Sequence, residues 1–159
     1  MNKLFGMIIS TVVVFGFSDI QLNAQSVIAT ATFEIKAEMH GGCEVMKSCP
    51  FYTLSPNGII TYTQPGILDG EFKQKPGIMN AQDFMELTQL LTAERLTSLE
   101  DSVFKGACPS YNDGEDYIFE IMRDGQKTRL NTCENALGDD PQIDTLIGFF
   151  GIFYRELAK

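Results

Sequence analysis

Apolar and polar residues alternate most clearly near the start of the chain. In residues 28–38, Phe33, Ile35 and Ala37 share one parity and charged residues occupy the other near the end of the segment. A β-strand places successive side chains on opposite faces, so this pattern predicts a half-buried strand. The segment His40-Gly41-Gly42 is expected to end it.

Two further segments predict a β-hairpin. Residues 51–54 and 59–64 are rich in β-branched and aromatic side chains, and Ser55-Pro56-Asn57-Gly58 separates them. Proline fixes φ and Asn-Gly supplies the left-handed backbone that a tight turn needs. Residues 70–75 indicate a short additional strand before Pro76-Gly77.

A second hairpin is predicted later in the chain. Residues 117–123 alternate, with Tyr117, Phe119 and Ile121 sharing one face, and Asp124-Gly125 is a strong turn signal before 127–133. If Arg123 pairs with Gln126, Cys133 lies beside Asp116.

Apolar residues at helical spacing predict the helices. Residues 81–92 follow a cap at Asn80 and carry the pattern Phe84, Leu87, Leu90, Leu91. Residues 93–105 have room for a shorter helical turn. Asp139-Asp140-Pro141 predicts the start of a C-terminal amphipathic helix, because acidic caps and proline favour the first turn.

The order of these elements predicts the fold class. It reads strand, hairpin, possible strand, helix, hairpin, helix. We therefore expect a two-layer α+β domain with a mainly antiparallel sheet of two β-hairpins plus the N-terminal strand, and two amphipathic helices on one face. No internal repeat or low-complexity linker divides the chain, so residues 25–159 are expected to form a single domain.

The N-terminus has the order of a secretory signal peptide. Lys3 is followed by an apolar run up to Phe17 and then by small residues ending at Ala24. The run is shorter than the roughly 20 residues that span a bilayer. The sequence predicts a signal peptide over residues 1–24, with cleavage after Ala29 as the alternative, and no membrane anchor after cleavage. The protein is then periplasmic or secreted.

Charge and cysteine content limit the expected partners and predict disulfide bonds. The net charge of −9 argues against nucleic-acid partners. Export would place all four cysteines in an oxidising compartment, so two disulfide bonds are expected. Three pairings are possible, and Cys43–Cys49 with Cys108–Cys133 is preferred because each pair lies within one local unit. Zinc binding by His40, Cys43 and Cys49, or redox activity of the two thiols, are the alternatives.

The segment Cys-x-x-x-x-x-Cys-Pro-x-Tyr, followed by Asn-Gly-x-x-x-Tyr, carries a resemblance. Its positions are Cys43, Cys49-Pro50, Tyr52, Gly58 and Tyr62. The motif resembles that of an uncharacterised bacterial family of secreted proteins and lipoproteins, a domain of unknown function. The resemblance implies export and an α+β fold, and it implies no activity.

Three groups of residues are candidates for chemistry or binding. Tyr52 and Tyr62 are candidates for an exposed binding surface on the first hairpin. The acidic loop residues Asp113, Glu115 and Asp116 are candidates for a calcium site, since oxygen donors crowd around a glycine. His40 is the one histidine and could act as a base for Cys49.

These features favour a non-catalytic, disulfide-stapled module that binds a protein or an envelope component. No catalytic residues and no cofactor are predicted. The alternatives are a small secreted hydrolase, using acidic residues or the Cys49/His40 pair, and a calcium-binding domain.

Overall fold

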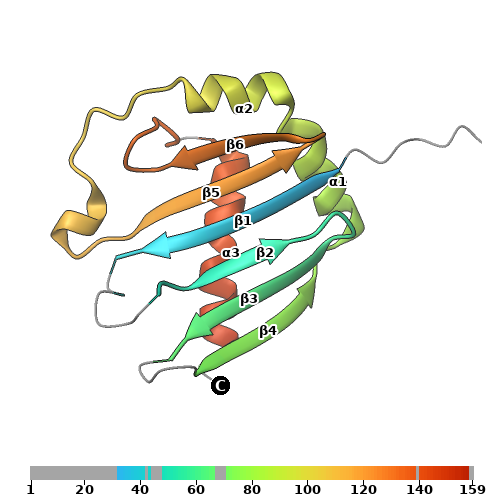
Figure 1. Cartoon of the computed structure of the whole chain (residues 1–159), viewed down its shortest axis with the longest axis vertical. Helices are drawn as coiled ribbons and strands as arrows, with labels where there is room; N and C mark the ends of the chain where they lie inside the picture. Colours follow the sequence, from blue (N-terminus) through green and yellow to red (C-terminus); the bar gives the residue numbers. More distant parts are fainter. Residues whose placement is uncertain (1–31, 42, 44–47, 67–70, 139, 158–159) are drawn as a thin grey trace, which may run out of the picture.

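A single six-stranded antiparallel sheet forms the centre of the molecule (Figure 1). The computed structural model describes residues 32–41, 43, 48–66, 71–138 and 140–157. The strands are β1 Phe33–His40, β2 Phe51–Leu54, β3 Ile59–Pro65, β4 Phe72–Ile78, β5 Asp116–Arg123 and β6 Gln126–Asn131. Their order in the sheet is β4-β3-β2-β1-β5-β6.

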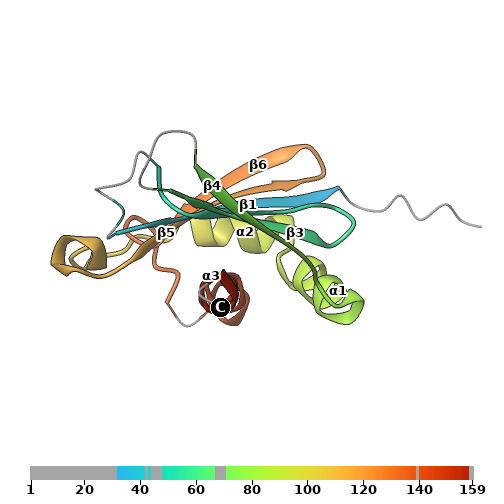
Figure 2. The same ribbon diagram turned by 90° about the horizontal axis from the view of Figure 1, so that it is seen from below.

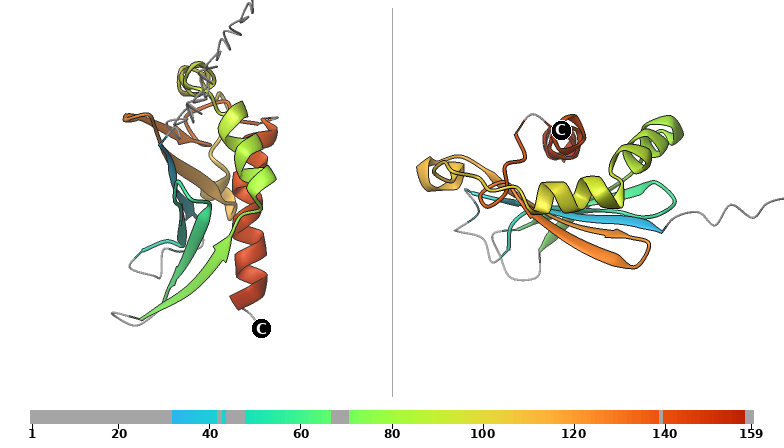
Figure 3. Two further views of the ribbon diagram at one scale, coloured as in Figure 1. Left: turned by 90° about the vertical axis from the view of Figure 1, so that its right-hand side faces the viewer. Right: turned by 90° about the horizontal axis from the view of Figure 1, so that it is seen from above.

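Within the described residues, all three α-helices cover the same face of this sheet (Figure 2). They are α1 (Ala81–Leu90), α2 (Ala93–Glu100) and α3 (Pro141–Leu157), and a short 3-10 helix, η1, spans Pro109–Asn112. Helix α3 crosses behind the central strands at a steep angle, and α2 contacts β6 (Figures 1 and 3). The two-layer α+β architecture is confirmed, with α2 as a third α-helix where a shorter turn was expected.

The register places one parity of every central strand in the core. Ala37 lies opposite Tyr52 on one side and Phe119 on the other, and Ile35 lies opposite Leu54 and Ile121. These residues are fully buried beneath the helices. The predicted face of β1, with Phe33, Ile35 and Ala37 together, is therefore confirmed.

Local signals determine where the chain turns. Asp124 and Gly125 have φ values of 50° and 81°, and Arg123 pairs with Gln126 as expected. Asn80 caps α1 by accepting a hydrogen bond from the Gln82 N–H at 2.8 Å. The buried Asp140 carboxylate caps α3 in the same way, accepting from the N–H groups of Gln142 and Ile143.

Strand β4 is longer than the sequence indicated. It continues through Pro76 and Gly77 to Ile78. Proline is tolerated there because β4 is an edge strand in this sheet and the missing N–H need not join a ladder.

The predicted signal peptide and its cleavage sites lie outside the described residues. Within the part of the chain that the structure describes, no helix combines the length and apolar character needed to cross a membrane.

Candidate functional site

Both disulfide bonds lie at the same end of the sheet. Cys43 and Cys49 connect the end of β1 to the start of β2, with Cα atoms 5.3 Å apart. Cys108 and Cys133 join the segment before η1 to the chain just after β6, with Cα atoms 5.0 Å apart. The preferred pairing is confirmed, and each disulfide ties a loop to the sheet at this end.

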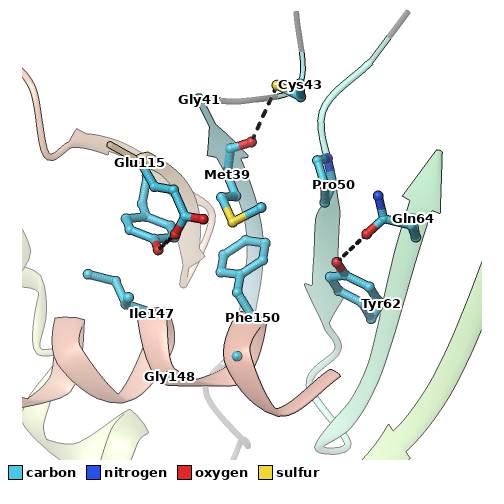
Figure 4. A pocket seen from close by; sticks show the side chains of 12 residues that line it. Met39, Gly41, Cys43, Pro50, Tyr62, Gln64, Glu115, Ile147, Gly148 and Phe150 are labelled. Atoms are coloured by element: carbon cyan, nitrogen blue, oxygen red, sulfur yellow. Dashed lines mark hydrogen bonds between the residues drawn. The ribbon is translucent and has the colours of Figure 1, made fainter. Parts of the chain in front are cut away.

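A pocket of about 560 Å³ opens at this end, between the sheet and α3 (Figure 4). Its lining is mostly apolar and comes from β1, β3, β5, α3 and the intervening loops. The lining residues are Met39, Gly41, Cys43, Pro50, Tyr62, Gln64, Glu115, Tyr117, Ile147, Gly148, Phe150 and Gly151. The volume is within the range of small-molecule sites, roughly 300–1,000 Å³.

Two glycines of α3 leave this space open. Gly148 and Gly151 lie three residues apart and therefore on one side of the helix. A Cβ added at either position would meet no atom within 4 Å. The missing side chains therefore widen the gap at the point where the helix borders the pocket.

A third glycine closes the rim. Gly41 has φ +113°, and a Cβ there would lie 2.2 Å from the backbone oxygen of Gly114. Close approach of the two backbones brings the end of β1 against the loop that carries Glu115. Gly41 is therefore required by both conformation and space.

Two tyrosine hydroxyls place polar groups on the pocket wall. Tyr62 donates to Gln64 Oε1 at 2.7 Å, and Tyr117 donates to Glu115 Oε2 at 2.5 Å. Gln64 and Glu115 lie on opposite sides of the pocket, with Met39 and Phe150 between them (Figure 4). Burial, together with the Glu115 carboxylate, raises the pKa of the Tyr117 hydroxyl above its usual value, so the hydroxyl stays a hydrogen-bond donor into the alkaline range.

Aromatic rings form much of the apolar wall. The Phe150 ring lies 5.4 Å from Tyr117 and 6.3 Å from Tyr62, measured between centroids. The distances are those of favourable aromatic pairs, which fix ring orientation. The wall is thus held in place before any ligand arrives.

The predicted binding surface at Tyr52 and Tyr62 is wrong as an exposed surface. Both side chains are fully buried, because their strand parity matches the core residues of β1. Tyr52 donates to the Leu146 carbonyl at 2.8 Å and belongs to the core. Tyr62 is also buried, and it borders the pocket from β3.

His40 and Cys49 do not form a nucleophile and base. Cys49 is bonded to Cys43, which leaves it no thiol. His40 lies at the end of β1, where its Nε2 is 3.3 Å from Glu38 Oε2. The same disulfide takes up the thiolates that the zinc alternative would need, whereas a disulfide is one of the two states of a redox-active pair, so the redox alternative stays a prediction.

The three acidic side chains of the predicted calcium loop lie in different environments. Asp113 follows η1 in a left-handed conformation, Glu115 borders the pocket, and Asp116 is buried with its Oδ2 accepting from the Ser110 N–H and hydroxyl. Within the described ranges, the one set of three potential ligands that converges is Cys108, Asp116 and Cys133. Both of its sulfur atoms are already in a disulfide. The calcium site at Asp113, Glu115 and Asp116 stays a prediction.

Several pocket residues were missed by sequence reasoning. Gln64 was predicted only as the last residue of a strand, and Met39 lay just beyond the predicted strand of residues 28–38. A signal for Gly148 and Gly151 was present, since glycine inside an amphipathic helix is unfavourable and often marks a packing or functional need. The pocket itself depends on where α3 crosses the sheet, which no local pattern specifies.

Comparison of the chain with known protein-family models and with curated proteins finds no match.

Proposed function

We propose that this protein is an exported, non-catalytic binding module, and that it holds part of a protein or envelope component in the pocket between the sheet and α3. The observation that carries the proposal is the pocket itself, about 560 Å³ with a mostly apolar lining. Pockets of this size and lining, with a few fixed polar groups, are the usual form of ligand sites.

Preorganisation supports a binding role. Aromatic pairs and tyrosine hydrogen bonds fix the wall, and the Cys43–Cys49 disulfide forms part of the rim. A site whose groups are held in place loses less conformational entropy when a ligand binds. The two disulfides also favour export, since such bonds persist in oxidising compartments.

The chemistry of the lining favours binding over hydrolysis. Among the described lining residues, Glu115 supplies the carboxylate, and Cys43 is oxidised. A hydrolase with acidic residues would place two carboxylates across the substrate. The pocket offers an apolar volume with one acid at its edge.

A neutral fluorescent probe, N-phenyl-1-naphthylamine, tests the proposal. We expect saturable fluorescence enhancement with one site per chain. Gly151→Leu should abolish it, because the added side chain extends into open space at the pocket. Gly151→Ala should weaken it less.

The matched control places the same leucine elsewhere on α3. Thr145 is an exposed residue of α3 outside the pocket lining, so Thr145→Leu should leave probe binding unchanged. Equal probe binding by the wild type and the folded Gly151→Leu protein would refute the pocket as the site.

A further inference from the structure

Glu115 is the one formally charged residue among the described residues that line the pocket. It is exposed and accepts a hydrogen bond from the Tyr117 hydroxyl. Among the described residues it forms no ion pair with a lysine or arginine. The carboxylate is therefore positioned by Tyr117 without being neutralised by a cation.

Aromatic rings adjoin this carboxylate. Tyr117 is half-buried on β5, and its ring lies 5.4 Å from that of Phe150 on α3. Tyr62 lines the opposite side of the pocket, beside Gln64, and its ring is stacked on that of Phe153. The faces of such rings attract cations, with most benefit where water is excluded.

We propose that the pocket selects ligands that carry an ammonium group on an apolar body, with the ammonium beside Glu115 and Tyr117 and the apolar part along Met39, Ile147 and Phe150. This inference rests on the proposed function, because it names the ligand class for the same pocket. It goes further by predicting the sign of the ligand's charge.

The alternative ligand charges are less favourable at this site. An anionic head group would approach Glu115 with no lysine or arginine in the described lining to neutralise it. The net charge of −9 also disfavours anions at long range. A neutral ligand of the same shape would keep the apolar contacts but would lose the attraction to the carboxylate and the rings.

Three ligands with the same eight-carbon chain test this selection: octyltrimethylammonium, octanol and octanoate. Each is titrated below its micelle-forming concentration, and binding is measured by displacement of N-phenyl-1-naphthylamine. We expect the ammonium compound to bind about tenfold more tightly than octanol, from one charge contact and cation–π attraction. Octanoate should bind most weakly.

Glu115→Gln removes the charge but keeps an oxygen that can accept from Tyr117. It should reduce the affinity for octyltrimethylammonium by about five- to tenfold and leave the affinity for octanol unchanged. Asp113→Asn is the matched control, because it changes net charge equally at an exposed position outside the lining. Asparagine also tolerates the left-handed conformation found at residue 113. This control should leave all three affinities unchanged.

The outcomes separate the inference from the proposed function. Equal binding of the three ligands, with Glu115→Gln having no effect while Gly151→Leu still blocks the probe, would overturn the charge selection and leave the pocket as the site. The same applies if Asp113→Asn weakens ammonium binding as much as Glu115→Gln. If Gly151→Leu fails to affect the probe or any ligand, the proposed function fails and the inference falls with it.

Discussion

Three tyrosines place polar hydroxyl groups on the apolar face of the sheet, one in the core and two at the pocket. Tyr52, Tyr62 and Tyr117 share the helix-covered face of the sheet, where each hydroxyl finds an oxygen acceptor. Alternation correctly predicted that Tyr117 shares a face with Phe119 and Ile121. It could not predict burial of Tyr52 and Tyr62, because either parity of an aromatic strand can face the core until the helices are placed.

The raised pKa of the Tyr117 hydroxyl gives a prediction for alkaline pH. Burial and the Glu115 carboxylate keep the hydroxyl protonated in the folded state, while in the unfolded chain it ionises near pH 10. The unfolded state therefore loses this proton first. The contribution of the Tyr117 hydroxyl to folding stability is fully present below about pH 10 and is lost as the pH rises above it.

Tyr117→Phe should make the fall in stability at alkaline pH shallower, as measured by urea denaturation at a series of pH values from 8 to about 11.5. Tyr52→Phe should act in the same direction, because burial also raises the pKa of that hydroxyl. If the stability profiles of Tyr117→Phe and the wild type stay parallel above pH 10, the raised pKa of Tyr117 is refuted.

At the scale of elements, local signals predicted most boundaries. Asn80 caps α1, Asp140 caps α3, and the Asn57-Gly58 and Asp124-Gly125 turns join their strands as expected. Caps and tight turns each depend on a few consecutive residues, so the sequence alone was enough to predict them. The pocket was not predictable in this way, because it arises where Gly148 and Gly151 of α3 meet residues of β1, β3 and β5.

Glycine substitutions in α3 test whether the helix retains these residues for the pocket. Glycine in a helix interior is less favourable than alanine by roughly 1 kcal/mol, and neither position has a neighbouring atom that a Cβ would strike. We expect Gly148→Ala and Gly151→Ala each to raise the free energy of unfolding by up to about 1 kcal/mol.

The same two variants should weaken binding of N-phenyl-1-naphthylamine. Higher stability together with weaker probe binding would mean that the two glycines lower the stability of α3 in order to leave space for the pocket. If both variants lower stability, the glycines serve the packing of α3 instead. The measurement is a urea denaturation curve and a probe titration on the same samples.

At the scale of the whole molecule, both disulfides and the pocket lie at one end of the sheet. The opposite end holds the tight hairpin turns and α1 (Figure 1). Sequence spacing predicted the two pairings, because each joins residues of one local unit. It could not show that the two units meet, since that depends on the pairing of β1 with β5, about 80 residues apart in the chain.

The two disulfides should differ in what they stabilise. The chain-entropy model assigns about 2 kcal/mol to the Cys43–Cys49 loop and about 3.5 kcal/mol to the longer Cys108–Cys133 loop. Replacing Cys108 and Cys133 with serine should therefore cost more stability in urea denaturation. Replacing Cys43 and Cys49 should cost less stability but more probe affinity, because Cys43 lines the pocket and Cys108 and Cys133 do not. The opposite result would be that the Cys108/Cys133 variant, while still folded, binds the probe more weakly than the Cys43/Cys49 variant. Probe affinity would then follow stability, and the Cys43–Cys49 disulfide would have no specific role in the pocket.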